Sequence, residues 1–318
     1  MPQEVRLVRA QLAQSLHDFA SARADFDRLA AERPDDLAVQ LGLAAVATVT
    51  GDYRAALASC DALTATAPEL IIVACKAPVE LVRGGAERAY RELSEQSRRS
   101  GDASPRLLAW VATLQGELAA SMGDAAAAER HLRGSLALAA DTYTKVALAD
   151  LYLATDRPAL VLELLADQDA NPGEPAEPGE PGEPAEPGDE AATQSDGLLL
   201  RLAIAQKRLR LPAGAASASA LRERLAATVA RGDFTHRREQ GLFELDVEGR
   251  PVEAVGLLLA NWELQKEPID ALLLLRAAAA ARSPKAAAPV LAWIEQHHVR
   301  DHAIDRALAE LTAAGAPQ

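Results

Sequence analysis

The residues best suited to bind a metal lie near the C-terminus, at 297–302, in the order His-His-Val-Arg-Asp-His. Imidazole and carboxylate groups are common zinc ligands, and His298, His302 and Asp305 would share one face of a continuous helix. The turn pattern described below instead predicts that one helix ends near His298 and that Asp301 starts the next. These histidines then form a polar helix end, and we predict no metal ion or other cofactor.

Cys60 and Cys75 are the only cysteines of the chain. If they lie on consecutive helices that pack side by side, the two sulfurs could meet as a disulfide, which would imply an oxidising compartment such as a periplasm. They could equally be two buried free thiols that pack as small apolar groups. A zinc-binding or redox Cys-x-x-Cys pair is absent.

The sequence contains none of the common catalytic motifs. It lacks a Gly-x-Ser-x-Gly elbow, a P-loop, a dinucleotide-binding glycine pattern and a His-Glu-x-x-His zinc motif. The pair Gly84-Gly85 fits a turn better than a phosphate loop. We therefore predict that the protein is not an enzyme.

The composition predicts helices. Hydrophobic residues make up 49% of the 318-residue chain, but aromatic residues only 3%. Alanine and leucine supply most of the apolar side chains, and both favour helices. No apolar run is long enough for a transmembrane span, and the N-terminus lacks the apolar centre of a signal peptide. The default expectation is a cytoplasmic protein; the alternative is a periplasmic one, if the chain is part of a longer exported protein.

The charge is concentrated in one segment. The net charge is −13, and residues 167–196 hold ten acidic and no basic side chains, so the remainder has 36 acidic against 33 basic residues. A nearly neutral remainder argues against nucleic-acid binding. Residues 171–188 repeat Pro, Gly and Glu without a large apolar residue, which is typical of a disordered or extended loop. This loop is either a tolerated insertion or an acidic arm for a basic partner.

Turn signals recur along the whole chain. They fall near His17, Gly51, Gly84, Gly123, Asp156, Arg210, Gly249 and Arg282, at spacings of 34, 33, 39, 33, 54, 39 and 33 residues. A helix pair cannot bury its own apolar face, but stacked pairs bury a continuous one. The spacing predicts about eight helix pairs, and the longer intervals accommodate inserted loops.

The clearest unit surrounds Gly123-Asp124. Gly116 allows a close helix approach before the turn, and Ala128 and Leu132 follow it on one helix face. This pattern resembles the tetratricopeptide repeat (TPR) family, whose period is about 34 residues. The same resemblance is carried in other units by small and bulky residues around the turn: Phe19, Ala22, Phe26, Pro34, Ala44, Tyr53, Ala56, Cys60, Pro68, Ala149, Tyr152, Pro158, Ala254 and Leu258. The family's leading tryptophan is missing from its usual place.

The resemblance implies an all-α, right-handed α-solenoid of about eight TPR-like helix-turn-helix repeats with a C-terminal capping helix. We expect repeats 1–5 in residues 1–166, the acidic Pro/Gly/Glu-rich loop in 167–196, repeats 6–8 in 197–300, and a capping helix and tail in 301–318. The capping helix begins at Asp301 and covers the apolar face of the last repeat.

In the TPR family the first helix of each pair lines a concave groove that binds peptides. The groove positions that the resemblance assigns in this chain are Trp110, Glu117, Tyr143, Asp150, Lys207, Arg208, His236, Phe243 and Arg276. The Lys and Asn clamp of chaperone-binding members is missing, because the matching positions hold Leu7, Gln11, Leu41 and Ala45. Two aromatic and two acidic residues at the centre favour a peptide with basic residues, unless they are ordinary packing positions.

The resemblance therefore implies a non-catalytic protein- or peptide-binding scaffold or assembly adaptor. Two alternatives remain: a metal-binding or thiol-redox protein that uses the histidine cluster or the cysteine pair, and a regulatory subunit of an enzyme system with catalysis elsewhere. The partner is expected to be a protein or a peptide, with no nucleic acid and no transmembrane segment.

Overall fold

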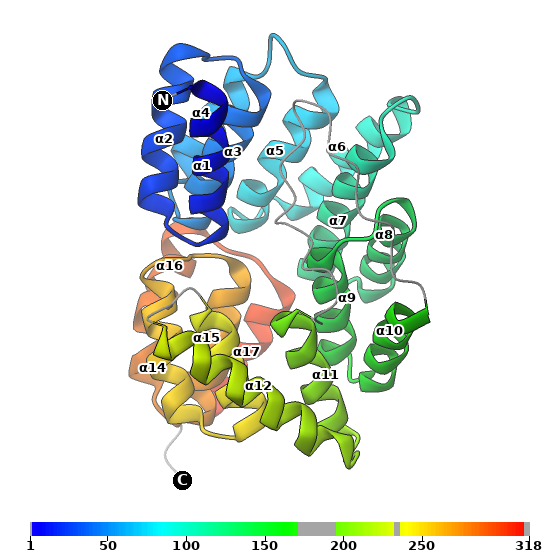
Figure 1. Cartoon of the computed structure of the whole chain (residues 1–318), viewed down its shortest axis with the longest axis vertical. Coiled ribbons are helices and arrows are strands. Elements are labelled where there is room, and N and C mark those ends of the chain that lie inside the picture. Colours follow the sequence, from blue (N-terminus) through cyan, green and yellow to red (C-terminus); the bar gives the residue numbers. More distant parts are fainter. Residues whose placement is uncertain (1, 171–194, 232–235, 315–318) are drawn as a thin grey trace.

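The chain folds into a stack of helix pairs (Figure 1). The structure, a computed structural model, describes residues 2–170, 195–231 and 236–314. Within these ranges every regular element is helical. The first five pairs are α1 (Gln3–Ser15) with α2 (Phe19–Glu32), α3 (Leu37–Val49) with α4 (Tyr53–Ala62), α5 (Glu69–Val82) with α6 (Ala86–Arg99), α7 (Pro105–Ser121) with α8 (Ala125–Leu138), and α9 (Thr142–Ala154) with α10 (Pro158–Ala170).

Three further pairs and a final helix complete the stack. They are α11 (Asp196–Arg208) with α12 (Ala213–Ala230), α13 (Arg237–Leu242) with α14 (Pro251–Trp262), α15 (Pro268–Ala280) with α16 (Ala288–His297), and α17 (His302–Ala314). A π-helical turn, η1 (Phe243–Glu248), extends α13, and a 3₁₀ turn, η2 (Pro284–Ala287), precedes α16. In the described ranges no helix is both long and apolar enough to cross a bilayer.

Each of the eight predicted turns contains a residue in the left-handed backbone region. These residues are Gly51, Gly84, Gly123 and Gly249, together with His17, Asp156, Arg210 and Arg282. The next residue's amide closes the turn by donating back to the first helix, as in Asp124 to the carbonyl of Ala119 at 2.9 Å. The predicted fold class, an all-α solenoid of helix pairs, is therefore confirmed.

The helix ends near the C-terminus also agree with the prediction. Helix α16 ends at His297, and His298 follows in the left-handed region. The Asp301 carboxylate then accepts hydrogen bonds from the amides of Ala303 and Ile304, at 2.9 and 3.0 Å, which starts α17.

The predicted loop 167–196 needs a correction at both ends. Helix α10 continues to Ala170 and α11 begins at Asp196, so the helices extend into the predicted segment. At the second end, the Ser195 hydroxyl caps α11 by accepting a hydrogen bond from the amide of Leu198 at 3.3 Å. The core of the proposed loop, residues 171–194, lies outside the described residues.

The sequence did not predict that the two ends of the stack meet. The amide of Lys266, just before α15, donates to the carbonyl of Val49 at 2.8 Å, and the Tyr53 hydroxyl donates to the carbonyl of Lys266 at 3.1 Å. The Trp293 indole on α16 donates to the Tyr53 oxygen at 2.9 Å. We call this contact between α3–α4 and α14–α16 the seam.

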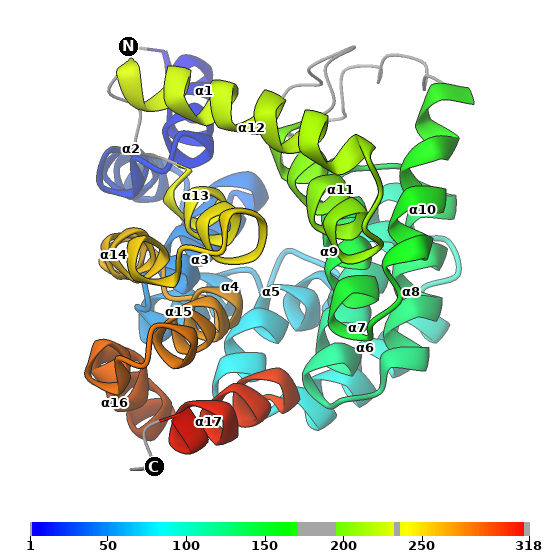
Figure 2. The same cartoon turned by 90° about the horizontal axis from the view of Figure 1, so that it is seen from below.

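The seam continues along the turns of the first four repeats. Gln265 lies 2.9 Å from a ring nitrogen of His17, at the first turn. A Cβ at Gly84 would come within 3.0 Å of the His298 carbonyl, and one at Gly123 within 3.0 Å of the His302 ring. Helix α17 packs on α15, as a capping helix should, and also reaches α7 (Figure 2). The C-terminal repeats thus cover the turn edge of the N-terminal repeats.

Candidate functional site

Glu117 and Tyr143 come together on neighbouring first helices, α7 and α9. The Tyr143 hydroxyl donates to the Glu117 carboxylate, while 63% of Tyr143 stays exposed. Desolvation raises the pKa of Glu117 to about 7; the Tyr143 hydrogen bond opposes that rise, and the charges of Glu267 and Asp141 add to it. Burial of this carboxyl group therefore disfavours its charged form.

Glu117 should make stability depend on pH. Folding raises the pKa of Glu117, so the protonated carboxyl group contributes to the stability of the folded protein. That contribution is fully present below pH 4.5, the pKa in the unfolded chain, and is lost as the pH rises through about 7. Glu117→Gln should therefore melt higher than the parent protein at pH 8, and the difference should disappear at pH 4.5. Thermal unfolding at both pH values measures this, with the exposed Glu87→Gln as a control. A melting difference that does not change with pH would contradict it.

The second predicted carboxylate, Asp150, is already paired. Its two oxygens accept from Nε and a terminal nitrogen of Arg201 at 2.8 and 2.7 Å, and Arg201 is 3% exposed. Trp110 is partly buried and packs against the apolar cluster of α5, α6 and α7. The centre of the predicted groove thus offers one exposed aromatic ring but no free carboxylate pair.

Three predicted basic residues converge on the end of η1. Lys207 donates to the carbonyls of Asp246 and Val247 at 3.0 and 2.6 Å, and Arg276 donates to the two carboxylate oxygens of Asp246 at 2.8 and 3.0 Å. Arg208 donates to the carbonyl of Leu153 at 2.6 Å. Lys207 and Arg208 thus bind backbone carbonyls near the ends of η1 and α9, and Arg276 binds the Asp246 side chain. All three side chains therefore join neighbouring helices to one another.

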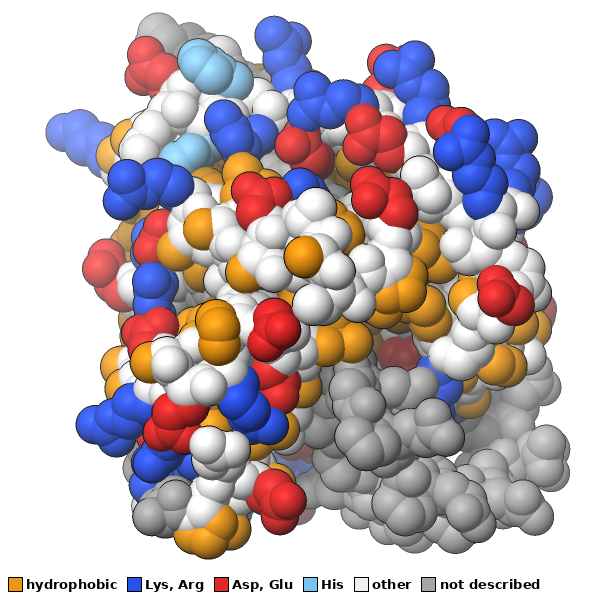
Figure 3. Space-filling view, turned by 90° about the horizontal axis from the view of Figure 1, so that it is seen from above, with side chains coloured by type: hydrophobic (Ala, Val, Ile, Leu, Met, Phe, Trp, Pro, Cys, Tyr) orange, Lys and Arg blue, Asp and Glu red, His pale blue; other side chains and the backbone are white. Residues whose placement is uncertain are grey.

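The remaining predicted residues have different surroundings. His236 is exposed, and its ring lies 6.4 Å from that of His17. Phe243 is 2% exposed and lies in the core. On the face seen in Figure 3, acidic and basic side chains are mixed among apolar ones, and no large area carries one sign of charge among the coloured side chains.

Cys60 and Cys75 form a disulfide that joins α4 to α5. Both residues are buried, at 0% and 6% exposure. Protein prepared without reductant is therefore expected to show no alkylation under denaturing conditions, measured by mass spectrometry. Two alkylated cysteines in that experiment would contradict the disulfide.

The histidine cluster does not form a ligand set. His298 lies in the left-handed turn and His302 begins the next helix, so no single helix face presents both with Asp305. His297 instead packs edge-on against Tyr53 in the seam, with ring centroids 4.9 Å apart. Across the described ranges, no group of three or more His, Cys, Asp or Glu side chains is placed to hold a metal ion.

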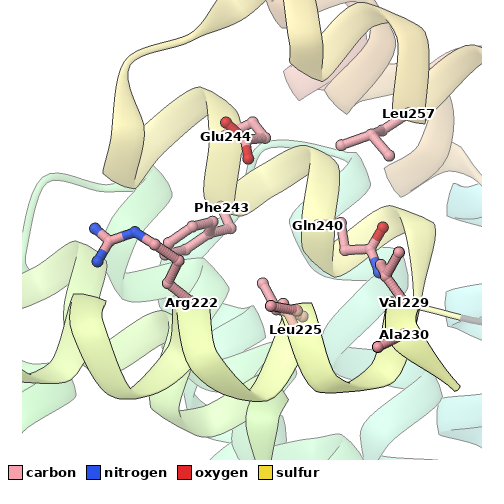
Figure 4. A pocket seen from close by; sticks show the side chains of 9 residues that line it. Arg222, Leu225, Val229, Ala230, Gln240, Phe243, Glu244 and Leu257 are labelled. Atoms are coloured by element: carbon pink, nitrogen blue, oxygen red, sulfur yellow. The ribbon is translucent and has the colours of Figure 1, made fainter.

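An apolar slot that the sequence did not predict opens between the sixth and seventh repeats. It has a volume of about 470 Å³ and lies between α12 on one side and α13, η1 and α14 on the other. Figure 4 shows Leu225 and Val229 of α12 facing Gln240 and Phe243 across this space. The described residues that line it are Arg222, Leu225, Ala226, Val229, Ala230, Gln240, Phe243, Glu244 and Leu257. We call this space the α12 slot.

Gln240 brings a buried amide into the α12 slot. It is 6% exposed, and among the described residues its side-chain nitrogen Nε2 has no hydrogen-bond acceptor. Glu244, the carboxylate of the lining, accepts a hydrogen bond from Arg250 through Oε1 at 2.9 Å. A buried unpaired amide costs about 1–3 kcal/mol. The Gln240 side chain points from α13 into the slot (Figure 4).

In the fourth repeat, a glutamine at the position that corresponds to Gln240 does have a hydrogen-bond partner on the preceding helix. Gln115 and Gln240 each directly precede a glycine, Gly116 or Gly241, whose Cβ position is blocked by a leucine 2.7 or 2.6 Å away. This places the two glutamines at equivalent positions. Gln115 donates to the Ser94 hydroxyl of the preceding helix, α6, at 3.0 Å. The π-helical turn after Gly241 adds one residue before the turn at Gly249, which hid this equivalence in the sequence.

Gln240→Leu should stabilise the unbound protein by about 1 kcal/mol, because it removes a buried unpaired amide and keeps the side-chain volume. Urea unfolding measures the change. Gln115→Leu serves as the matched control and should destabilise the protein, because it leaves Ser94 without this partner. Equal effects of the two changes would contradict the assignment of Gln240 as unpaired.

Comparisons with known proteins give fold neighbours only. No protein-family model and no curated protein matches the chain. A TPR protein of Thermus thermophilus is 25% identical with a TM-score of 0.46, covering 54% of this chain and 93% of its own. A TPR protein of Parabacteroides merdae is 12% identical with a TM-score of 0.40, covering 99% of both chains. Yeast Tom70 is 12% identical with a TM-score of 0.42, covering 93% of this chain and 58% of its own.

Proposed function

We propose that this protein is a non-catalytic scaffold that binds a peptide segment of a partner protein in the α12 slot. The observation that carries the proposal is a buried glutamine amide without an acceptor inside an apolar space. The partner segment would place a bulky apolar side chain between Leu225 and Phe243. It would also offer a hydroxyl or backbone carbonyl oxygen to Gln240, as Ser94 does to Gln115.

The size and lining of the slot fit this class of ligand. Pockets for small ligands and cofactors, which have the size of one or two peptide side chains or more, commonly enclose about 300–1,000 Å³ and combine apolar walls with a few polar groups. The slot has about 470 Å³ and one buried amide. Gln240 supplies direction, because an apolar peptide that cannot accept its hydrogen bond leaves the amide unpaired.

The test selects peptides of twelve residues from a random display library against the full chain, and then measures the affinity of the selected peptides by fluorescence anisotropy. The slot variant is Val229→Glu, which places a charge at the rim because Val229 is 46% exposed. The matched control is Val252→Glu on α14, where the valine is 68% exposed and does not line the slot.

The expected result is a set of peptides that share a bulky apolar residue, that bind at least tenfold more weakly to Val229→Glu, and that bind unchanged to Val252→Glu. Gln240→Leu should reduce the preference for peptides with an acceptor oxygen. Failure to enrich any peptide, or equal binding to both glutamate variants, would refute the slot as the binding site.

A further inference from the structure

Helix α1 exposes a row of large apolar side chains. Val5, Val8, Leu12 and Leu16 are 52%, 63%, 56% and 54% exposed, respectively. Residues three and four apart lie on one side of a helix, so the four form a continuous strip at the first end of the stack. We call this strip the α1 stripe. It shares no residue with the α12 slot and does not depend on the function proposed above.

The α1 stripe repeats an interface that the other repeats bury. Val5, Val8 and Leu12 lie twelve, nine and five residues before the left-handed turn residue His17. The same positions in the second, third and fourth repeats are buried or hold glycine: Val39 0%, Gly42 and Val46 0%; Ile72 3%, Cys75 6% and Val79 0%; Val111 0%, Leu114 7% and Leu118 1%.

The element that covers these positions is the second helix of the preceding pair. Val39 and Val46 of α3 pack in one cluster with Phe26 and Leu29 of α2. Val111, Leu114 and Leu118 of α7 pack in one cluster with Ala86, Ala89 and Leu93 of α6. The covering helix therefore combines small and large apolar residues. The α1 stripe, which resembles the α7 set most closely, continues this series of interfaces, but no helix of the described residues covers it.

We propose that the α1 stripe binds an amphipathic helix of a partner protein, seated as the second helix of a preceding repeat would be. The surrounding charges do not select the partner, because Arg6 is paired with Glu32 at 2.9 Å and Arg9 with Asp25 at 2.5 Å. Recognition then depends on the apolar face of the partner helix. Small residues on that face would let the two helices approach closely, and one large residue would pack between the valines and leucines of the α1 stripe.

A second copy of this chain is a poorer fit than a different helix. Two α1 stripes facing each other would set large side chains against large ones, without the small residues that α6 supplies inside the fold.

The test uses a peptide with the sequence of residues 85–100, which contains α6, as the probe. A side-chain lactam between Glu87 and a lysine replacing Arg91 fixes the helix, since both residues are exposed in the protein. Circular dichroism confirms that the labelled peptide is helical before it is titrated with the full chain. A peptide that also carries Leu93→Glu is the control ligand, because Leu93 belongs to the covering face.

The expected result is saturable binding that Leu12→Glu weakens at least tenfold, because the change replaces a large apolar side chain of the interface by a charge that the partner helix would have to bury. Val252→Glu, which changes an exposed valine on α14 outside the α1 stripe, should leave the affinity unchanged. Both variants alter exposed residues, so thermal unfolding should match the parent protein.

Three outcomes would overturn the proposal. The first is no saturable binding of the helical peptide up to millimolar protein. The second is equal affinity for the parent protein and Leu12→Glu. The third is a dimer of the parent protein in sedimentation that Leu12→Glu converts to monomer, because the occupant of the α1 stripe would then be a second copy.

Discussion

Replacing Trp293 by alanine is expected to lower the free energy of unfolding by about 3–5 kcal/mol, the usual range for a buried tryptophan. Trp293 is 5% exposed, packs edge-on against Trp262 with ring centroids 5.3 Å apart, and donates to Tyr53 across the seam. The change leaves a cavity in the last repeats and removes the hydrogen bond to the first ones. Urea unfolding measures the loss.

Small-angle X-ray scattering distinguishes the cavity in the last repeats from the loss of the hydrogen bond across the seam. If Trp293 holds the ends of the stack together, Trp293→Ala should also increase the radius of gyration under conditions where circular dichroism shows full helicity. Trp262→Ala is the control, because Trp262 is equally buried but makes no hydrogen bond to Tyr53. A similar loss of stability without any expansion would show that the seam does not depend on Trp293.

The second large effect is expected at Arg238. Its guanidinium donates to both oxygens of Asp270 at 2.6 and 2.9 Å, to Gln265 at 2.6 Å and to Glu267 at 2.5 Å. Asp270 is 2% exposed and also accepts from Asn261 at 2.7 Å. Arg238→Met should cost about 3–5 kcal/mol at pH 7.5, because it leaves a buried carboxylate without its cation.

This loss should shrink in acid. Burial raises the pKa of Asp270 to about 6 even beside Arg238, and removing the arginine raises that pKa further. A carboxyl group whose pKa is raised on folding stabilises the protein when it is protonated. For Asp270 this stabilisation is fully present below pH 3.8, its pKa in the unfolded chain, and is lost as the pH rises through its pKa in the folded protein. Arg238→Met should therefore approach the stability of the parent protein near pH 4.5.

A surface pair provides the control for Arg238. Arg23 lies 3.1 Å from Asp52, but their side chains are 37% and 46% exposed. Arg23→Met should cost no more than about 1 kcal/mol at either pH. If Arg238→Met behaves in the same way, or if its cost does not change with pH, Asp270 does not carry the buried charge assigned to it.

Local sequence patterns predicted the helix pairs because each turn carries its own signal. Gly51, Gly84, Gly123 and Gly249 adopt the left-handed backbone directly. Where the sequence has His17 or Arg282 instead, only the regular spacing indicated the turn, and the structure still places these residues in the same backbone region. Such a signal needs no knowledge of the rest of the chain.

The seam and the α12 slot could not be predicted in this way. Tyr53 and Trp293 are 240 residues apart, and nothing in their local sequence links them. The slot depends on how far α12 stands from α13, and the π-helical turn after Gly241 shifts Gln240 by one position relative to the repeat pattern. One local feature could have indicated the slot. Gln240, directly before Gly241, is polar, whereas the corresponding positions of two other repeats hold the buried Leu43 and Leu148.

The groove residues illustrate a limit of transferring positions from a family. Asp150 and Glu117 lie on first helices, as expected, but Arg201 and Tyr143 occupy their oxygens. Position along a helix indicates which face a side chain occupies. It does not indicate whether a neighbour from the next repeat has already paired with that side chain.

The most direct test of the proposed function is the position of a bound peptide. A peptide selected against the full chain, carrying a photoreactive group beside its apolar residue, should cross-link to α12 or to residues 240–257, as mapped by mass spectrometry after proteolysis. Cross-links at Trp110 and Tyr143 instead would place the peptide in the concave groove and contradict the α12 slot as the binding site.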